Sequence, residues 1–426
     1  MKTEPIGESS VTEDTFSARE PIKVCMHYAD RTDARVMRDA TALVEAGFAV
    51  TIVDVESDRT RPAEEEIRGV HLKHILMPSY FVPARFKPWF LVKLAMLAIY
   101  GTIQLLRVQA DIYHAHVERA LPACYIAARL RGKPFIVDTP ELTLTEPIYA
   151  RWLRLRVLVI RIIRHMVLYC AGYITASPLY PQELAKLYGA KEVTLIRNVP
   201  PYQAAPKSDR LRQHLGLGPE VRIALYQGGV QPNRRLDRLI RAAAFLRQDI
   251  LIVLMGSGPK KTLSELEALI VSEGVADRVK IIPAVPYEEL MEWTASANIG
   301  LTPLAPDYSL NTQLHLPNKL FEYLMAGLPV LSLQYDAIAE LIKRYEVGTV
   351  MSSLAPQDVG AAINAMLADQ DSLARMSSNA LEVAKLEFCW EKESGQLIRL
   401  YYDVLGCESH NAEYRTQSST SVPLSH

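Results

Sequence analysis

The stretch LHLPNKLFEYLMAGLPVLSL, residues 314–333, reads as a short helix followed by a buried strand. Its apolar residues fall at helical spacing from Leu320 to Met325, and Pro-Asn-Lys stands just before them. The first backbone N–H groups of a helix have no partner within it and carry the positive end of its dipole. A helix that begins near Asn318 therefore offers a phosphate site, and Lys319 would add a full positive charge.

Glu322 lies one turn into the same helix. Its carboxylate can accept two hydrogen bonds from a vicinal diol, as acidic residues do with the ribose in dinucleotide sites. The segment thus predicts phosphate and ribose recognition at one helix end. An ordinary exposed glutamate that stabilises a helix N-terminus is the alternative when this segment is taken alone.

Outward from this stretch, short β-branched runs alternate with helix-length segments, a pattern typical of doubly wound, largely parallel sheets. A proline-rich stretch at 198–220 interrupts the pattern, which then restarts. We therefore predict an α/β protein with two Rossmann-like lobes facing a cleft, where ligands bind beyond the carboxyl ends of the strands. The expected strands are 22–28, 48–55, 110–117, 133–139, 172–177, 193–198, 221–228, 249–256, 278–285, 299–304, 329–333 and 348–353.

The domain boundaries are predicted from this break and from composition. Residues 21–198 form an N-terminal lobe, 199–219 a linker, and 220–406 a C-terminal lobe whose last helix packs back toward the first lobe. The tails 1–20 and 407–426 are polar and expected to be disordered. The first tail carries acids where a signal peptide would need an apolar run, so a cytoplasmic protein is expected.

Composition excludes several classes of protein. The chain of 426 residues suits two domains, and its 47 Lys and Arg nearly cancel its 48 Asp and Glu. That balance argues against a nucleic-acid partner, because such binding depends on a basic excess. The five cysteines lack CxxC spacing, which indicates neither a disulfide framework nor a zinc site.

A second phosphate-binding element is predicted in YQGGVQPNRRLDRLIRAAAFL, residues 226–246. A strand runs into Gly228 and Gly229, where missing side chains let a ligand approach the backbone. Arg234 and Arg235 then open a helix. Glycine pairs at strand ends are also common as plain turns, and the VLMGSGP turn at 253–259 is assigned to close packing alone.

Taken together, these motifs resemble a retaining glycosyltransferase of the group 1, family-four kind, with the two-lobed GT-B fold. The resemblance rests on YQGGVQPNRRLDRLI, VLMGSGP and LPNKLFEYLMAGLPV in the second lobe. In the first lobe it rests on DARVMRDATALVEAGFAVTIVD, ADIYHAHVERALPA and AGYITASPLYPQELAKLYGAKEVTLIRNVP. It covers about residues 22 to 406. It implies a nucleoside diphosphate sugar as donor, held by the second lobe, an acceptor held by the first, and no cofactor or metal.

The resemblance also implies roles for individual residues. Glu322 would hold the donor ribose, and Arg234 and Lys319 would stabilise charge on the departing diphosphate. His116 would lie near the transferred sugar. Backbone groups around Gly228, Gly229, Asn318, Lys319 and Leu320 would meet the donor, and Glu141 and Arg35 are acceptor-side candidates.

Three departures from the family pattern stand out. Where the family often has a glutamate that contacts the donor sugar, this chain has Leu314. The nearby polar candidates for that contact are Asn311, Gln313 and His315. Gly229 replaces a second basic residue, and Pro140 stands where many members have a histidine before the glutamate, which weakens the case for Glu141.

His114 and His116 would share one face of a strand, about 7 Å apart, which raises the possibility of a metal site. No third ligand of matching spacing is evident in the sequence, so no metal is predicted. A buried, hydrogen-bonded histidine is the alternative for His116.

Two acid-free stretches, 67–110 and 147–182, carry six and five Lys or Arg respectively. The first includes the apolar run 89–106, in which Trp89 and Phe90 lie. A membrane span is rejected there, because the sheet pattern needs a crossover helix at this point. In the second stretch Arg151, Arg154, Arg161 and Arg164 share a helical face, near Trp152 and Leu153. This predicts either contact with an anionic membrane surface or a solvated helix.

The sequence thus predicts a cytoplasmic glycosyltransferase, peripheral to the inner face of the membrane, that builds a lipid-linked glycan or surface polysaccharide. Alternatives are an NDP-sugar epimerase or glycosidic-bond hydrolase on the same scaffold, or a catalytically silent GT-B subunit that binds nucleotide or scaffolds a partner enzyme. Leu314 favours the silent subunit, whereas the presence of His116, Arg234, Lys319 and Glu322 favours catalysis.

Overall fold

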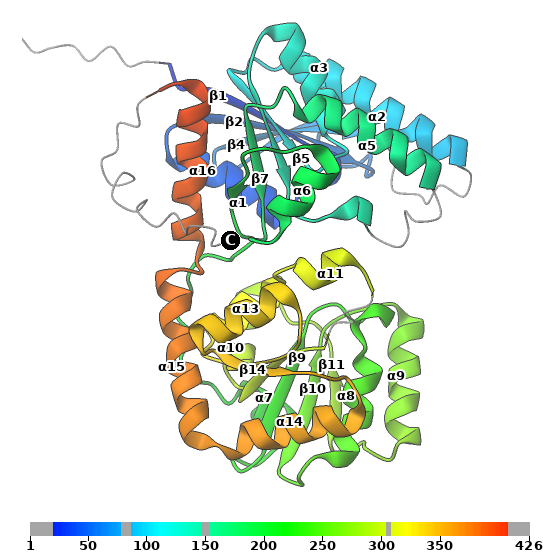
Figure 1. The fold of residues 1–426 in the computed structure, drawn as a ribbon, viewed down its shortest axis with the longest axis vertical. Helices are drawn as coiled ribbons and strands as arrows, with labels where there is room; N and C mark the ends of the chain where they lie inside the picture. Colours follow the sequence, from blue (N-terminus) through cyan, green and yellow to red (C-terminus); the bar gives the residue numbers. More distant parts are fainter. Residues whose placement is uncertain (1–19, 78–86, 146–152, 304–307, 408–426) are drawn as a thin grey trace, which may run out of the picture.

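The computed structural model describes residues 20–77, 87–145, 153–303 and 308–407, which form two lobes (Figure 1). Most of each predicted tail lies outside the described residues. Each lobe is built on one sheet, with strand order β3-β4-β2-β1-β5-β6-β7-β8 in the first and β11-β10-β9-β12-β13-β14 in the second. The predicted fold of two doubly wound sheets is confirmed.

All strand pairs are parallel except β3 with β4. The first-lobe strands are β1 (Lys23–Tyr28), β2 (Ala49–Glu56), β3 (Glu64–Ile67), β4 (Val70–Leu76), β5 (Ile112–His116), β6 (Phe135–Thr139), β7 (Gly172–Thr175) and β8 (Thr194–Leu195). The second-lobe strands are β9 (Arg222–Gln227), β10 (Ile250–Met255), β11 (Val279–Ile282), β12 (Ile299–Thr302), β13 (Val330–Leu333) and β14 (Gly348–Met351).

Helices cover both faces of the first sheet because its strands are apolar on both sides. The helices of this lobe are α1 (Ala34–Glu45), α2 (Lys87–Arg107), α3 (Leu121–Arg131), α5 (Leu153–Val167) and α6 (Tyr180–Tyr188). Tyr113 and Val137 point to the face covered by α2, α3, α5 and α6. Ile112 and Ile136 point to the opposite face, which α1 covers.

The second lobe has a single apolar core. Its helices are α7 (Arg210–Leu215), α8 (Leu236–Ala242), α9 (Lys260–Ser272), α10 (Tyr287–Thr294), α11 (Leu310–Leu314), α12 (Asn318–Met325), α13 (Asp336–Tyr345), α14 (Pro356–Ala368) and α15 (Gln370–Leu386). Helix α7 lies within the stretch predicted as a linker, and its Leu211 is buried in the second-lobe core.

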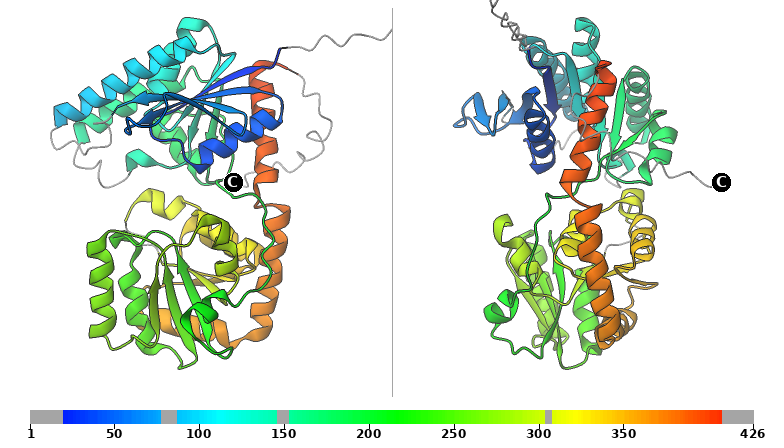
Figure 2. Two further views of the ribbon diagram at one scale, coloured as in Figure 1. Left: turned by 180° about the vertical axis from the view of Figure 1, so that it is seen from behind. Right: turned by 90° about the vertical axis from the view of Figure 1, so that its left-hand side faces the viewer.

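The last helix, α16 (Trp390–Leu405), returns to the first lobe. Its residues Leu397, Ile398 and Tyr401 are buried among first-lobe side chains on the α1 face of the sheet. Figure 2 shows α15 and α16 following one another along one side of both lobes. At its start, Glu393 accepts hydrogen bonds from the backbone and side chain of Arg197 at 2.8 and 2.7 Å.

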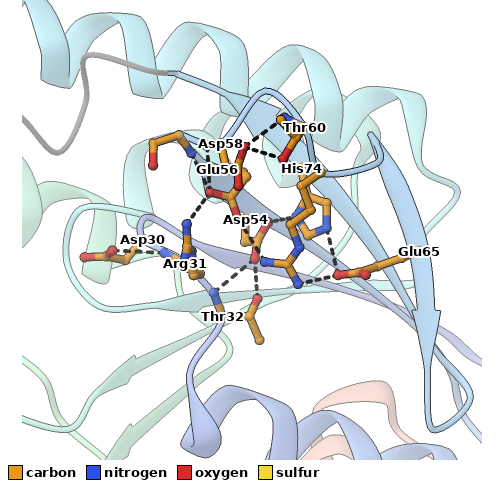
Figure 3. A network of polar contacts seen from close by, with 11 residues as sticks. Asp30, Arg31, Thr32, Asp54, Glu56, Asp58, Thr60, Glu65 and His74 are labelled. Atoms are coloured by element: carbon orange, nitrogen blue, oxygen red, sulfur yellow. Dashed lines mark hydrogen bonds and ion pairs between the residues drawn. The ribbon is translucent and has the colours of Figure 1, made fainter.

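The hairpin β3–β4 was missed by the sequence patterns and is held by a network of paired charges (Figure 3). Glu56 accepts from Arg31 at 2.5 Å and from Arg61 at 2.9 Å. His74, on β4, lies between Asp54 at 2.5 Å and Glu65 at 3.2 Å. Through Asp54 and Glu56, which lie on β2, these contacts connect the hairpin to Arg31 in the loop after β1.

Among the described residues, none of the helices has both the length and the apolar composition needed to cross a membrane.

Candidate functional site

A cavity of about 670 Å³ lies between the lobes. Its walls come from the carboxyl ends of β9, β10 and β11 and from α11 and α12, while the first lobe contributes Glu141 and Asn198. The strand order of the second sheet reverses between β9 and β12, so the cavity sits where doubly wound folds bind ligands.

Predicted donor-side residues come together in this cavity, which is lined by Gly228, Gly229, Arg234, Asn318, Lys319 and Glu322. The residue before α12 is Pro317, which provides no side-chain hydrogen bond to the helix start. Backbone N–H groups of the first turn are therefore uncapped by a side chain at the cavity wall. This is the arrangement that favours an anion.

Glu322 is fixed by a residue that the sequence patterns did not single out. Gln227, the last residue of β9, donates from Nε2 to Glu322 Oε2 at 2.5 Å, and its own Oε1 accepts from the Thr294 hydroxyl at 2.7 Å. Burial raises the pKa of Glu322, while the Gln227 hydrogen bond opposes that rise. One carboxylate oxygen is thus held, and Glu322 lines the cavity.

Lys319 is packed between an aromatic ring and a glycine. Its Nζ lies 3.9 Å from the centre of the Tyr226 ring. A Cβ built on Gly228 would meet this Nζ at 3.1 Å, and the φ of 123° at Gly228 also requires glycine. Burial and the Arg234 charge lower the pKa of Lys319 to about 7, against a smaller opposing effect of Glu322.

Arg234 is the cation that most influences its neighbours in the cavity. Its Nε is buried and has no hydrogen-bond partner among the described residues. Its charge adds to the effect of burial in lowering the pKa of His315 to about 4, and it opposes the rise that burial causes in the pKa of Glu141. Arg234 and Lys319 together suit a ligand with two negative phosphates.

The VLMGSGP turn serves the close packing that was predicted for it, and it also lines the cavity. A Cβ on Gly256 would lie 1.9 Å from the Gly228 carbonyl oxygen, so only glycine permits this approach. Gly256 and Ser257 are nevertheless cavity residues, a contact that the sequence interpretation did not assign.

Three of the residues to which the resemblance assigns roles, Leu320, His116 and Arg35, are not part of the cavity wall. Leu320 is fully buried in the second-lobe core, and its backbone N–H donates to the Pro317 carbonyl at 2.9 Å. His116 is 2% exposed, and its Nε2 has no hydrogen-bond partner among the described residues. Arg35 is also buried. Acceptor contact by Arg35 and sugar contact by His116 stay predictions.

These first-lobe residues form a buried cluster. His116 Nδ1 lies 3.3 Å from Asp138 Oδ2. Arg35 donates to both Asp138 oxygens, at 2.9 and 3.2 Å, and to the Ile196 carbonyl. The His114 ring stacks on His116 with ring centres 4.0 Å apart, and its Nδ1 is 2.7 Å from the Tyr401 hydroxyl on α16.

Asp138 supplies the third potential metal ligand that the sequence interpretation did not find beside His114 and His116. It was missed because it lies on the next strand, where it pairs in register with His116. The Arg35 guanidinium already pairs with both of its oxygens, which opposes a cation there. A second pair of acidic residues that could be considered as a metal site is the Asp-x-Asp sequence at 369–371, at the start of α15. Asp369 caps this helix by accepting a hydrogen bond from the Ser372 N–H, and the sequence does not line the cavity.

Helix α11 crosses from the second lobe into contact with the first. Leu314 is buried in the first-lobe apolar cluster, and the Ser177 hydroxyl donates to its carbonyl at 2.5 Å. Leu314, which stands where the resemblance predicts a glutamate, therefore packs against the other lobe. Asn311 and His315 line the cavity, whereas Gln313 does not.

Comparison with known proteins identifies relatives over most of the chain. The model described as Glycosyltransferase Family 4 matches residues 35–199, and the one described as Glycosyl transferases group 1 matches residues 207–383. A D-inositol 3-phosphate glycosyltransferase of Thermobispora bispora is 28% identical over 239 residues, which are 53% of this chain and 54% of that protein. The chain thus matches about half the length of such curated relatives.

Solved structures share the fold. Sucrose-phosphate synthase from Thermosynechococcus elongatus aligns with a TM-score of 0.73 at 16% identity, covering 90% of this chain and 99% of that one. Anabaena Alr3699/HepE in complex with UDP and glucose aligns with a TM-score of 0.69 at 16% identity, covering 90% and 100%. With both lobes matched by family models and the whole architecture shared, the chain belongs to the group 1 glycosyltransferases and has the GT-B fold.

Proposed function

We propose that this chain transfers a sugar from a nucleoside diphosphate sugar to an acceptor, with retention of configuration at the anomeric carbon. The observation that carries the proposal is the joint placement of Arg234, Lys319, the uncapped start of α12 and Glu322 around one interlobe cavity. Two cations and a helix N-terminus suit the diphosphate, and a carboxylate one turn away suits the ribose.

In this proposal the second lobe acts on the leaving group. When the bond from the sugar to the diphosphate breaks, negative charge grows on the phosphate oxygens, and fixed positive groups stabilise that charge. Lys319 is packed against Tyr226 and Gly228 at the carboxyl end of β9, and Arg234 lines the same cavity, so both positive charges already lie where the diphosphate would bind. Removing one such donor typically costs about 100-fold in rate.

Retention is proposed to proceed by attack on the same face from which the diphosphate leaves, with a phosphate oxygen taking the proton of the acceptor. The carboxylates among the described lining residues are Glu141 and Glu322. Glu322 is committed to Gln227 and to the ribose role. Glu141, which lies on the first-lobe wall, is proposed to contact the acceptor, and His116 to lie near the transferred sugar.

We further propose that the acceptor is carried by a lipid and that the first lobe docks on an anionic membrane from the cytoplasmic side. Helices α2, α3 and α5 pack beside one another on one face of the sheet (Figure 1). None of the three contains an Asp or Glu. More than half of the large exposed apolar side chains in the described residues lie on them, including Ile99, Leu130 and Leu158.

This combination of apolar side chains with unopposed cations is what a surface needs to bind anionic lipid. Arg161 and Arg164 on α5 are exposed beside Leu158 and Ile162. Arg151, Arg154 and Trp152, which were predicted to share this surface, lack a described side-chain placement. The role in building a lipid-linked or surface glycan rests on this proposed docking.

A catalytically silent subunit that binds nucleotide is the second candidate, because Leu314 replaces the acid that contacts the donor sugar in the family pattern. A thermal-shift panel tests the shared part of both functions. UDP, GDP and their common sugar conjugates should raise the melting temperature, and a sugar conjugate should raise it more than the matching nucleoside diphosphate. No shift with any nucleotide would contradict both candidates.

A further inference from the structure

Helix α11 contacts the first lobe and also lines the interlobe cavity. Leu314 is 8% exposed, and Leu310 packs against the same first-lobe cluster. The adjoining Asn311 and Thr312 line the interlobe cavity. A carboxylate at position 314 would have to enter an apolar cluster without a partner, which is costly. The first-lobe contact therefore explains why this position is not acidic here.

The orientation of the Asn311 amide is fixed by its partners. The Leu142 backbone N–H donates to Asn311 Oδ1 at 3.0 Å, and the Tyr180 hydroxyl donates to the same oxygen at 2.5 Å. A backbone N–H can only donate, so the side-chain atom that faces Leu142 must be the oxygen rather than the nitrogen. Both lone pairs of this oxygen are thereby used by the first lobe.

The Nδ2 group of Asn311 is left for the cavity. Asn311 is 9% exposed and lines the cavity, and the described residues provide no acceptor for its two amide hydrogens. His315, one turn further along the chain, lines the same wall, and its Nδ1 is 3.4 Å from the Tyr180 hydroxyl. Tyr180 therefore anchors the amide and lies beside the imidazole.

We infer that Asn311 is the specificity-determining residue that takes the place of the missing acid, its amide N–H groups donating to hydroxyl oxygens of the transferred sugar. This inference rests on the proposed function, since it assigns the sugar end of the same donor. It reverses the polarity of the contact: an acid can only accept from a sugar hydroxyl, whereas this amide can only donate. His315 completes the wall as a second, neutral polar contact.

The closing experiment separates the sugar from the nucleotide. Titration calorimetry gives the dissociation constants of UDP and UDP-glucose, or of GDP and GDP-mannose if that pair shifts the melting temperature more. The dissociation constant of the nucleoside diphosphate divided by that of its sugar conjugate measures how much the sugar contributes to binding. Asn311→Asp keeps an oxygen toward Leu142 and Tyr180 but replaces the donors with an acceptor. We expect it to lower this ratio about tenfold while changing nucleoside diphosphate affinity less than about threefold.

A hydroxyl can also donate, so fluorinated donors make the test stricter. A C–F group accepts weakly and cannot donate, so at the contacted ring position the deoxyfluoro donor should bind the unaltered chain far better than it binds Asn311→Asp. Gln313→Ala, on the same helix but off the cavity wall, is the matched control and should change neither constant. Should Asn311→Asp fail to fold, Tyr180→Phe removes one anchor and should lower the ratio about threefold.

The outcomes separate the inference from the proposed function. If the unaltered chain binds no nucleotide, the proposed function is wrong and the sugar contact is wrong with it. If the unaltered chain binds nucleotide, but Asn311→Asp leaves the ratio unchanged or weakens the nucleoside diphosphate equally, only the role of Asn311 is overturned.

Discussion

At the scale of single residues, Glu322 and Gln227 act as one unit. The Gln227 amide holds one carboxylate oxygen of Glu322 at 2.5 Å, and Glu322 lines the cavity. Glu322→Ala should therefore weaken nucleoside diphosphate binding by about 1.5–3 kcal/mol, because charge-assisted hydrogen bonds to the ribose are lost. Titration calorimetry checks this, with circular dichroism to confirm the fold. An unchanged affinity in a folded variant would remove the ribose role.

The lowered pKa of Lys319 leads to a prediction about how donor affinity depends on pH. Its pKa is lowered to about 7, so in the free protein it is charged below that pH and increasingly neutral above it. A bound diphosphate favours the charged form, so binding above pH 7 must take up a proton. Donor affinity should be flat from pH 6 to 7 and fall by up to about tenfold per unit above pH 7.

Calorimetry in buffers of different ionisation enthalpy measures that proton uptake directly. Lys319→Arg stays charged throughout and serves as the control. Any titration of the ligand affects both proteins equally, so the difference between the two pH profiles reports Lys319 alone. A wild-type profile as flat as that of Lys319→Arg would show that Lys319 does not meet the diphosphate.

Local chemistry made several site residues visible in the sequence. The glycines at the end of one strand, and the lysine and glutamate in the first turn of one helix, could each be recognised within their own short segment, and the cavity brings the two segments together. Gln227 and Asp138 stayed hidden because their partners are distant in sequence. Gln227 meets Glu322 across 95 positions, a contact that only the packing of α12 on β9 creates.

At the scale of elements, α11 joins the two lobes through Leu314. Leu314→Glu should place an unpaired carboxylate in the first-lobe apolar cluster and destabilise the protein by about 2–4 kcal/mol. Denaturant unfolding measures this effect. Gln313→Glu introduces the same charge one residue earlier on the same helix, at a half-buried position, and should cost much less. Equal stability of the two variants would mean that Leu314 does not hold the lobes together.

The predicted strands and the structure agree wherever strands are buried on both faces, since an apolar run is then unavoidable. Strand β3 escaped notice because it is an edge strand that carries charge, whereas β4 lies between β3 and β2, buries Val70, Leu72 and Ile75, and was overlooked despite its alternating pattern. Glu64, Glu65 and Glu66 form most of β3, and the strand is held by ion pairs and backbone pairing rather than by an apolar face.

At the scale of the whole molecule, helices α2, α3 and α5, which contain no Asp or Glu, lead us to expect that the protein binds liposomes. Each cation near an anionic leaflet contributes about 1 kcal/mol, so four suffice for reversible docking, and exposed apolar side chains leave a salt-resistant remainder. We expect flotation with anionic but not neutral liposomes. The fraction that floats should fall markedly when Arg151, Arg154, Arg161 and Arg164 are changed together to Gln.

A matched control removes four exposed cations of the second lobe, Arg241, Lys260, Lys261 and Lys343, and should float like the unaltered chain. If both quadruple variants lose flotation equally, only the net charge matters. If neither variant loses flotation, the four arginines between positions 151 and 164 do not contact the membrane and a soluble acceptor is favoured.

The central claim is that the interlobe cavity activates a nucleoside diphosphate sugar for transfer. The most direct measurement is the release of UDP or GDP when the purified chain is mixed with a panel of sugar nucleotides and a polar-lipid extract. We expect lipid-dependent release from one donor, and a kcat lowered about 10- to 1000-fold by Arg234→Ala with a smaller change in donor KM. Donor binding without any release, or release that Arg234→Ala leaves intact, would contradict it.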